Sequence, residues 1–260
     1  MAGWHHHRRH PSAQGAYPGR RRSTQLVLSR KPLGMLVSGS SHEELFHKVA
    51  ELDTTVTQVR AQPCTLLVAI GGRLSRQTPD AAVMVDGRAE LHEVKEAVEF
   101  AKADVKAELL EVRDEVERHG RWHYSVTLDT DLRTEPLLTN TDLLWRAHGD
   151  EYDQGLEMRT RELLDDVPLA IGEVLDRLRV VVDHADVGLT WESLLSMICD
   201  GVIDYDVNKK ITCDSLVWTT FSGPARLRTL PFRRPLRRSG AAATPPTATP
   251  FLGMAMRGAR

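Results

Sequence analysis

The sequence predicts an α/β fold: a mixed central sheet flanked by helices, followed by a small helical domain. Three patterns lead to this expectation: helical spacing of apolar residues over 41–52, apolar runs of strand length between residues 55 and 95, and a long amphipathic stretch over 96–118. The chain has 260 residues, of which 41% are hydrophobic, so it is long enough to bury a sizeable core.

The expected elements of the first part follow from local signals. Gly71-Gly72 and Asp86-Gly87 are typical of hairpin turns, and Gly120 is placed to end the long helix. In chain order, we expect a helix over 41–52, strands over 55–60, 65–70, 81–85 and 89–95, a helix over 96–118, a strand over 122–128, and a helix over 140–147.

A polar stretch with two glycines, residues 147–155, predicts a boundary between two domains, over 36–148 and 155–220. The second is expected to hold helices over about 156–165, 168–182 and 190–200, then a strand-like segment over 210–220. Short helices followed by a two-stranded wing are the layout of a winged helix. We expect the remaining segments, 1–35 and 221–260, to be disordered basic tails, because both are rich in Arg and Pro without periodicity.

Charge is divided sharply along the chain. The formal net charge is −2, yet residues 1–42 and 215–260 carry 15 Lys/Arg and no acid, which leaves residues 43–214 with a formal charge of −17. An acidic body with basic ends differs from a protein that coats DNA with one basic face. If the chain meets nucleic acid, its tails or a metal site must offset the repulsion from the body.

Several classes of protein are excluded at this stage. No run approaches the roughly 20 apolar residues of a membrane span, and no apolar segment follows the basic N-terminus as in a secretory signal. Cys64, Cys199 and Cys213 are too few and too widely spaced for a disulfide framework or a zinc knuckle, so we expect a cytoplasmic protein. No Gly-rich phosphate loop and no zincin motif is present.

The strongest candidate site is a pair of carboxylates with a lysine. Asp80 precedes one arm of the expected hairpin, and Glu93 and Lys95 lie two residues apart on the other arm, so they share one face. Carboxylates of this kind suit Mg²⁺, which would activate a water and polarise a phosphate while the lysine stabilises charge. In a chain with 36 acids, the alternative is that Asp80 and Glu93 are ordinary residues at strand ends. His92 faces the opposite side from Glu93, so we expect it to be a core or surface histidine.

Glu44 is the third candidate ligand, because the first turn of a helix packed on the sheet could reach a metal held by Asp80 and Glu93. A capping box formed by Ser41 and Glu44 would explain Glu44 equally well. Glu43 is the alternate ligand.

Together these residues resemble the PD-(D/E)xK nuclease superfamily, and within it the TnsA-type transposon endonucleases. The resemblance extends from about Leu33 to Ala147. It covers Ser41 with Glu44, Asp53 with Val56, Gln62-Pro63, Thr78-Pro79-Asp80, Glu93-Val94-Lys95, Val126-Thr127-Leu128-Asp129, and Asn140 before Leu143-Leu144. In the second domain, Leu194-Leu195 and the segment 201–206 resemble the winged-helix-like C-terminal part of those proteins.

The resemblance implies a restriction-endonuclease-like core and a Mg²⁺-dependent DNA endonuclease, with Mn²⁺ as the usual substitute metal. It also implies that one DNA strand is cut at transposon ends, with a DDE-type transposase and an AAA+ ATPase regulator as partners. Carried over by position, Glu44, Asp80 and Glu93 would be the metal ligands, and Lys95 the catalytic lysine.

Two alternatives stay open. One is a catalytically silent DNA-binding or assembly component, and the other is a PD-(D/E)xK nuclease of restriction or repair.

Overall fold

The structure is a computed structural model. It describes residues 25–31, 35–85, 87–118, 120, 122–181, 191–220 and 222–223. The expected turn residue Asp86 and most of the two expected tails, residues 1–24, 32–34, 221 and 224–260, lie outside the described residues.

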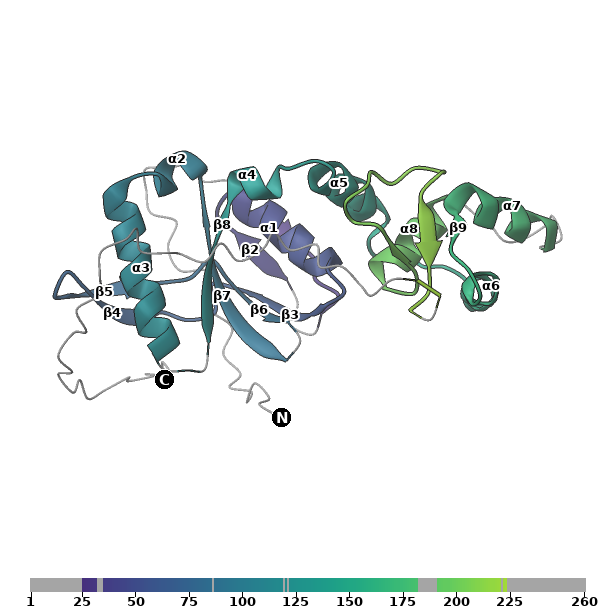
Figure 1. The fold of residues 1–260 in the computed structure, drawn as a ribbon. Coiled ribbons are helices and arrows are strands. Elements are labelled where there is room, and N and C mark those ends of the chain that lie inside the picture. Colours follow the sequence, from purple (N-terminus) through teal and green to yellow (C-terminus); the bar gives the residue numbers. More distant parts are fainter. Residues whose placement is uncertain are drawn as a thin grey trace.

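The centre of the first part is a mixed four-stranded sheet (Figure 1), as the sequence predicts. Its strands lie in the order β3, β6, β7, β8, with bounds Val56–Ala61, Ala81–Val85, Arg88–Lys95 and His123–Leu128. The first two pairings are antiparallel, and β8 runs parallel to β7. The parallel pairing requires a crossover, which the helices between β7 and β8 provide.

Helices cover the two faces of this sheet (Figure 1). On one face, Phe46 and Val49 of α1 (Ser41–Leu52) pack with Val83 and Val94. On the other face, the apolar side of α3 (Ala103–Arg118) packs in one cluster with residues of β6, β7 and β8. The sheet therefore separates two apolar layers, and alternate residues of each strand point into different layers.

A short antiparallel ribbon precedes α1, formed by β1 (Gln25–Val27) and β2 (Leu36–Ser38). The expectation of disorder through residue 35 therefore does not hold for residues 25–31. Val27 is buried against α1, and the Lys31 ammonium donates to the carbonyls of Ala50 and Asp53 at 2.6 and 2.8 Å. Lys31 thus caps the C-terminal end of a helix that has no basic residue in its own last turn.

A second ribbon, of which the sequence predicts only the first strand, pairs β4 (Leu66–Ile70) with β5 (Arg73–Gln77). Gly71 and Gly72, with φ of 55° and 79°, form the two-residue turn between the strands. β5 was not expected because its sequence, Arg-Leu-Ser-Arg-Gln, lacks an apolar run. Its partners across the ribbon and in α3 hold it instead.

The single helix expected over 96–118 is wrong, because the chain forms α2 (Ala97–Phe100) and then α3. The Asp129 carboxylate accepts the Ala97 N–H at 2.8 Å and fixes the start of α2. No residue of α2 is buried, and its Val98 is 78% exposed. Of these two helices, therefore, α3 has buried residues that pack against the sheet and α2 has none.

Most of the remaining elements form a second core, coloured from teal to yellow-green in Figure 1, whereas Leu132 of the short helix after β8 packs in the first core. Two helices, α4 (Asp129–Leu132) and α5 (Leu137–Ala147), lead out of the sheet. Helices α6 (Gln154–Leu164), α7 (Ile171–Val181) and α8 (Trp191–Cys199) follow, with β9 (Leu169–Ala170), β10 (Asp204–Tyr205) and β11 (Leu216–Trp218) as a three-stranded sheet in the order β10, β11, β9. The strand expected over 210–220 is limited to β11, and β9 joins it as a third strand.

Buried contacts connect the two cores. Leu52, the last residue of α1, packs in the second core. The side chain of Asn140, which is 1% exposed, donates to the Lys209 carbonyl at 2.8 Å and accepts from the Ile211 N–H at 2.9 Å. Asn140, one of the residues that carry the resemblance, thus has a structural role between α5 and the loop before β11.

Candidate carboxylate and lysine site

The structure brings Asp80, Glu93 and Lys95 together at one end of the central sheet. In the β6–β7 pairing Ala81 lies opposite His92, so Asp80 and Glu93 lie at the next position of the same antiparallel ladder. By strand alternation both share the face of Ala82 and Leu91, which pack in the α3 layer. The juxtaposition that the sequence predicts across the hairpin is therefore present.

Short contacts fix the three side chains. The N–H of Val94, between Glu93 and Lys95, donates to Asp80 Oδ2 at 2.7 Å. Lys95 Nζ lies 2.7 Å from Glu93 Oε1, and these side chains are only 25% and 14% exposed. One carboxylate is thus held by a backbone amide and the other by the lysine.

The three charged groups of this site have pKa values displaced from their usual range. Burial and the nearby Glu93 charge raise the pKa of Asp80 from 3.8 to about 7. Burial also raises the pKa of Glu93, and the Glu43 charge adds to this, although Lys95 opposes it. Burial acts to lower the pKa of Lys95, but the Glu93 and Asp80 carboxylates outweigh it, so this pKa is raised. Two carboxylates share a partly buried site with one ammonium, which leaves an excess of negative charge.

Tyr124, which the sequence analysis did not single out, belongs to this site. It lies on β8 opposite Leu91 of β7 and is buried, and its side chain forms a hydrogen bond with Glu93. Burial and the charge of Glu93 raise the pKa of the phenol, which therefore stays a neutral donor toward the carboxylate. The alternating β8 pattern predicts an inward Tyr124, but its partner depends on the parallel register.

In the first turn of α1, Glu43 is the acid whose charge acts on Asp80 and Glu93. Glu44 instead pairs with Lys48 one turn later, at 2.7 Å. The expected Ser41–Glu44 capping box is wrong by one residue. Ser40 is the N-cap and accepts the Glu43 N–H at 3.2 Å, while the Glu43 carboxylate accepts from the Gly39 N–H at 2.8 Å and the Ser40 hydroxyl at 3.0 Å.

The donor set suits a hard divalent cation. Mg²⁺ binds proteins through one or two carboxylates and completes its shell with waters and substrate phosphate. Asp80 and Glu93 supply two carboxylates whose mutual repulsion a cation would relieve. Among the described residues, no three acid, histidine or cysteine side chains already converge as a metal cage. Asp80 and Glu93 are thus the two carboxylates of this site that could hold such a cation.

His92 lies on the opposite face of β7, as expected, and is a buried core histidine. Its ring centroid is 5.0 Å from that of Phe46, and its Nδ1 lies 3.4 Å from Thr127 Oγ1. Its Nε2 lies 3.4 Å from the buried carboxylate of Glu90. These contacts place it in the α1 layer, away from Glu93 and Lys95.

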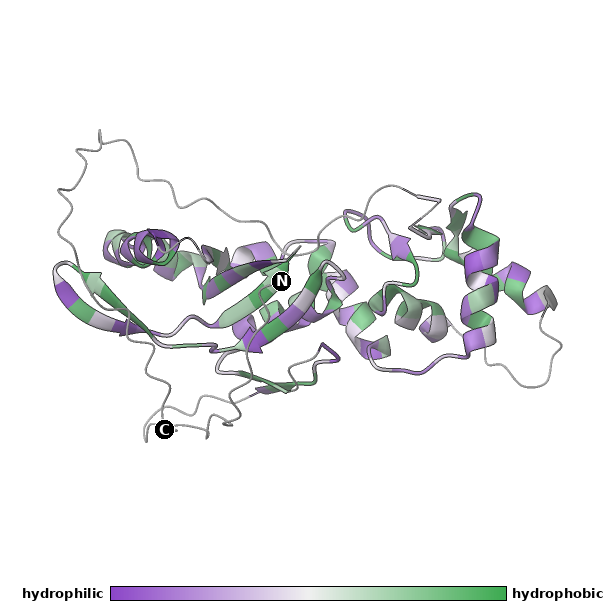
Figure 2. Ribbon diagram, turned by 90° about the horizontal axis from the view of Figure 1, so that it is seen from below, coloured by the Kyte–Doolittle hydropathy of each residue, from purple (hydrophilic) through white to green (hydrophobic). Residues whose placement is uncertain are grey.

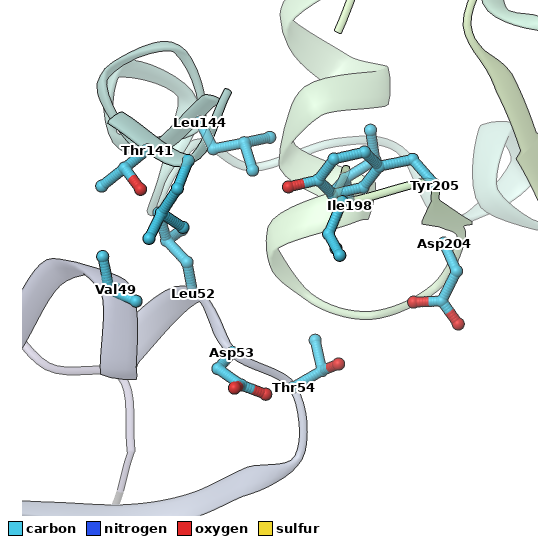
Figure 3. A pocket seen from close by; sticks show the side chains of 11 residues that line it. Val49, Leu52, Asp53, Thr54, Thr141, Leu144, Ile198, Asp204 and Tyr205 are labelled. Atoms are coloured by element: carbon cyan, nitrogen blue, oxygen red, sulfur yellow. The ribbon is translucent and has the colours of Figure 1, made fainter. Parts of the chain in front are cut away.

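A small pocket of about 30 Å³ lies elsewhere, between the two cores (Figure 3). Its lining includes Leu52 at the end of α1, Asp53 just after it, Leu144 of α5, Ile198 of α8 and Tyr205 of β10, and neither carboxylate of the site reaches it. Its volume admits a water or two, so it is too small for a substrate.

A scan against known family models matches none, and a search of curated proteins finds no significant relative. Within the part of the chain that the structure describes, each helix is too short or too polar to cross a bilayer.

Proposed function

We propose that this chain is a metal-dependent DNA endonuclease that hydrolyses a phosphodiester bond at the Asp80–Glu93–Lys95 site. The observation that carries the proposal is the excess negative charge held beside a lysine: two facing carboxylates with raised pKa values, one ammonium, and Tyr124 and a backbone amide as orienting donors. Strongly perturbed groups with a defined geometry are typical of functional sites.

In this proposal Asp80 and Glu93 hold the cation, and Glu43 adds negative charge from the first turn of α1, in place of Glu44. Bound Mg²⁺ or Mn²⁺ would polarise the scissile phosphate and lower the pKa of an attacking water. Lys95 keeps its proton because both carboxylates stabilise it, so it serves as a fixed positive charge toward the phosphate. The Val94 amide and the Tyr124 hydroxyl hold the carboxylates in place.

The resemblance to TnsA-type proteins supplies the biological part of the proposal. A restriction-endonuclease-like core would cut one strand at transposon ends in a reducing cytoplasm, with a DDE-type transposase and an AAA+ ATPase as partners. For the second core we propose a winged-helix-like role in these contacts. Supporting it are α6, α7 and α8, followed by the antiparallel pair of β10 and β11.

The test is calorimetric Mn²⁺ titration together with nicking of supercoiled DNA. We expect wild type to bind Mn²⁺ and to nick, and Asp80→Asn and Glu93→Gln to lose both. Lys95→Ala should keep Mn²⁺ binding and lose nicking. Asp142→Asn, an exposed change on α5, is the matched control. Equal Mn²⁺ binding by wild type and Asp80→Asn, or nicking that survives Lys95→Ala, would refute the proposal.

One observation favours a second function, a catalytically silent DNA-binding or assembly component. Lys95 already pairs with Glu93, and Glu43 is engaged at the helix cap, so each group has a purely structural partner. This function requires DNA binding that survives Asp80→Asn, needs no metal and weakens with salt. Absence of Mn²⁺ binding even with DNA present would favour it over the nuclease.

A further inference from the structure

The segment between Asp53 and Asp80 departs from the charge of its surroundings. Its 26 residues, 54–79, contain Arg60, Arg73 and Arg76 and no acid, although residues 43–214 as a whole have a formal charge of −17. None of the three arginines forms an ion pair with another described residue. These guanidinium groups are free to meet an external anion.

The fold presents two of these arginines on the β4–β5 ribbon, which projects from the central sheet on the left of Figures 1 and 2. We call this ribbon, residues 66–77, the basic arm. Its inner face is fixed on α3: Val68 is 1% exposed, the Gly71 N–H donates to Glu111 at 2.7 Å, and the Gln77 amide donates to Glu108 at 2.6 Å. The acids of α3 therefore lie toward the inner face, where they anchor the arm.

The outer face of the arm is open. Leu67 pairs with Arg76, and Ala69 pairs with Leu74, so these four side chains share the side away from Val68. Leu67 and Leu74 are 56% and 71% exposed, and Arg76 is exposed beside them. Arg73 pairs with Ile70 and so lies on the side of Val68, but it is exposed next to the Gly71-Gly72 turn at the end of the arm. Arginine beside an exposed aliphatic side chain on a two-stranded ribbon is a combination used to contact DNA grooves.

The arm begins close to the candidate site. Only Thr78 and Pro79 separate β5 from Asp80, so the arm starts where the carboxylates lie. A five-residue strand extends roughly 16 Å, and the arm can therefore follow about five base pairs of duplex. An acidic body needs such a local positive surface to hold a polyanion near its carboxylates.

We propose that the outer face and the turn end of the basic arm bind duplex DNA beside the phosphate that the candidate site attacks. Arg76 contacts the sugar–phosphate backbone from the outer face, Arg73 contacts it from the turn end of the arm, and Leu74 lies against the groove. This inference rests on the proposed function for its placement, but the arm's affinity for DNA is measured without metal and without cleavage.

The experiment is fluorescence anisotropy of a labelled DNA duplex in EDTA over a series of salt concentrations. Arg73→Ala/Arg76→Ala is compared with Arg88→Ala/Arg159→Ala, which removes the same charge from exposed positions at the far end of β7 and on α6. We expect the arm variant to bind roughly tenfold more weakly, and the slope of log affinity against log salt to fall by about two, since two phosphate contacts are lost. Arg73→Lys/Arg76→Lys should restore the salt slope.

Equal affinity and equal slope for the arm and control variants would overturn the inference. So would unchanged DNA binding together with a change of oligomeric state in Leu74→Asp, because the arm would then contact protein. The two proposals fail separately. Nicking by wild type with no effect of the arm variant on binding removes the arm and keeps the nuclease. Weaker DNA binding by the arm variant, with no nicking by wild type, would remove the nuclease and keep the arm.

Discussion

Replacing Asp80 by asparagine tests the electrostatic strain of the candidate site. Asparagine keeps the shape of the side chain, and its Oδ1 can still accept the Val94 N–H that lies 2.7 Å from Asp80 Oδ2. The change removes one of two facing negative charges. In buffer without divalent metal at pH 8, we therefore expect Asp80→Asn to have a larger free energy of unfolding than wild type.

The magnitude follows from the displaced pKa. Burial and Glu93 raise the pKa of Asp80 from 3.8 to about 7. Because one pH unit of displacement corresponds to about 1.4 kcal/mol, ionising Asp80 in the folded protein costs up to about 4 kcal/mol more than in the unfolded chain. Glu93 can accept part of the protonation, which lowers the cost. We expect Asp80→Asn to gain about 2 kcal/mol.

The sign of the pH dependence is fixed by the same displacement. Between about pH 4 and 7 the folded protein binds more protons at Asp80 than the unfolded chain does. The contribution of Asp80 to wild-type stability is therefore lost as pH rises through this range. The gap between Asp80→Asn and wild type should be small at pH 4 and complete at pH 8.

Urea unfolding in EDTA at several pH values measures this gap. Asp142→Asn, exposed on α5, should change the free energy of unfolding by less than about 0.5 kcal/mol at every pH. The reasoning is refuted if Asp80→Asn is no more stable than wild type at pH 8, or if the gap does not grow with pH.

Two further predictions concern α1. Glu43→Gln keeps one of the two cap acceptors, for the Gly39 N–H, but removes the charge that acts on Asp80 and Glu93, so Mn²⁺ affinity should fall roughly fivefold. Glu44→Gln, which loses only the pair with Lys48, should leave Mn²⁺ affinity unchanged. Calorimetry of both variants checks this, and an equal effect would contradict it. Burial lowers the pKa of His47 from 6.5 to about 4. Between these pH values the unfolded chain binds more protons at His47 than the folded protein does. The free energy of unfolding should therefore fall by up to about 3 kcal/mol as the pH drops from 6.5 to 4. His47→Asn can keep the contact with Ser38, which lies 2.8 Å from His47 Nδ1, and should show a shallower loss in acid-to-neutral urea titrations; a loss as steep as wild type would contradict the assignment.

Elements that depend on a local residue pattern could be predicted from the sequence. The β6–β7 hairpin has a continuous apolar run on its first arm, apolar residues among polar ones on its second, and a glycine with φ of 74° at its turn, so register and facing residues follow from the chain itself. This is why Asp80, Glu93 and Lys95 could be placed together. Strands β1 and β5 could not be predicted in this way, because β1 has three residues and β5 is polar, and each is held by its pairing partner and by a helix distant in sequence.

The residue at which α1 is capped, and hence the role of Glu43, could not be predicted from the local sequence either. The chain carries two consecutive serines followed by two consecutive glutamates, so a capping box fits Ser40 with Glu43 and Ser41 with Glu44 equally well. In the structure the Gly39 N–H, just after β2, donates to Glu43, and this contact selects the first pair. Which helix acid is fixed at the cap, and acts through its charge on Asp80 and Glu93, thus depends on β2, which lies outside any helix pattern.

The cap does not prevent Glu43 from contributing at the candidate site. Its Oε2 accepts from Gly39 and its Oε1 from Ser40, and each carboxylate oxygen has a second acceptor position. A carboxylate fixed by two donors has lost its rotamer freedom before any cation arrives, so it can add charge, or a bond through water, at a smaller entropic cost. Glu44 lacks these anchors and is drawn toward Lys48. Capping and charge therefore support each other at Glu43, because the contacts that begin α1 also fix the carboxylate whose charge acts on Asp80 and Glu93.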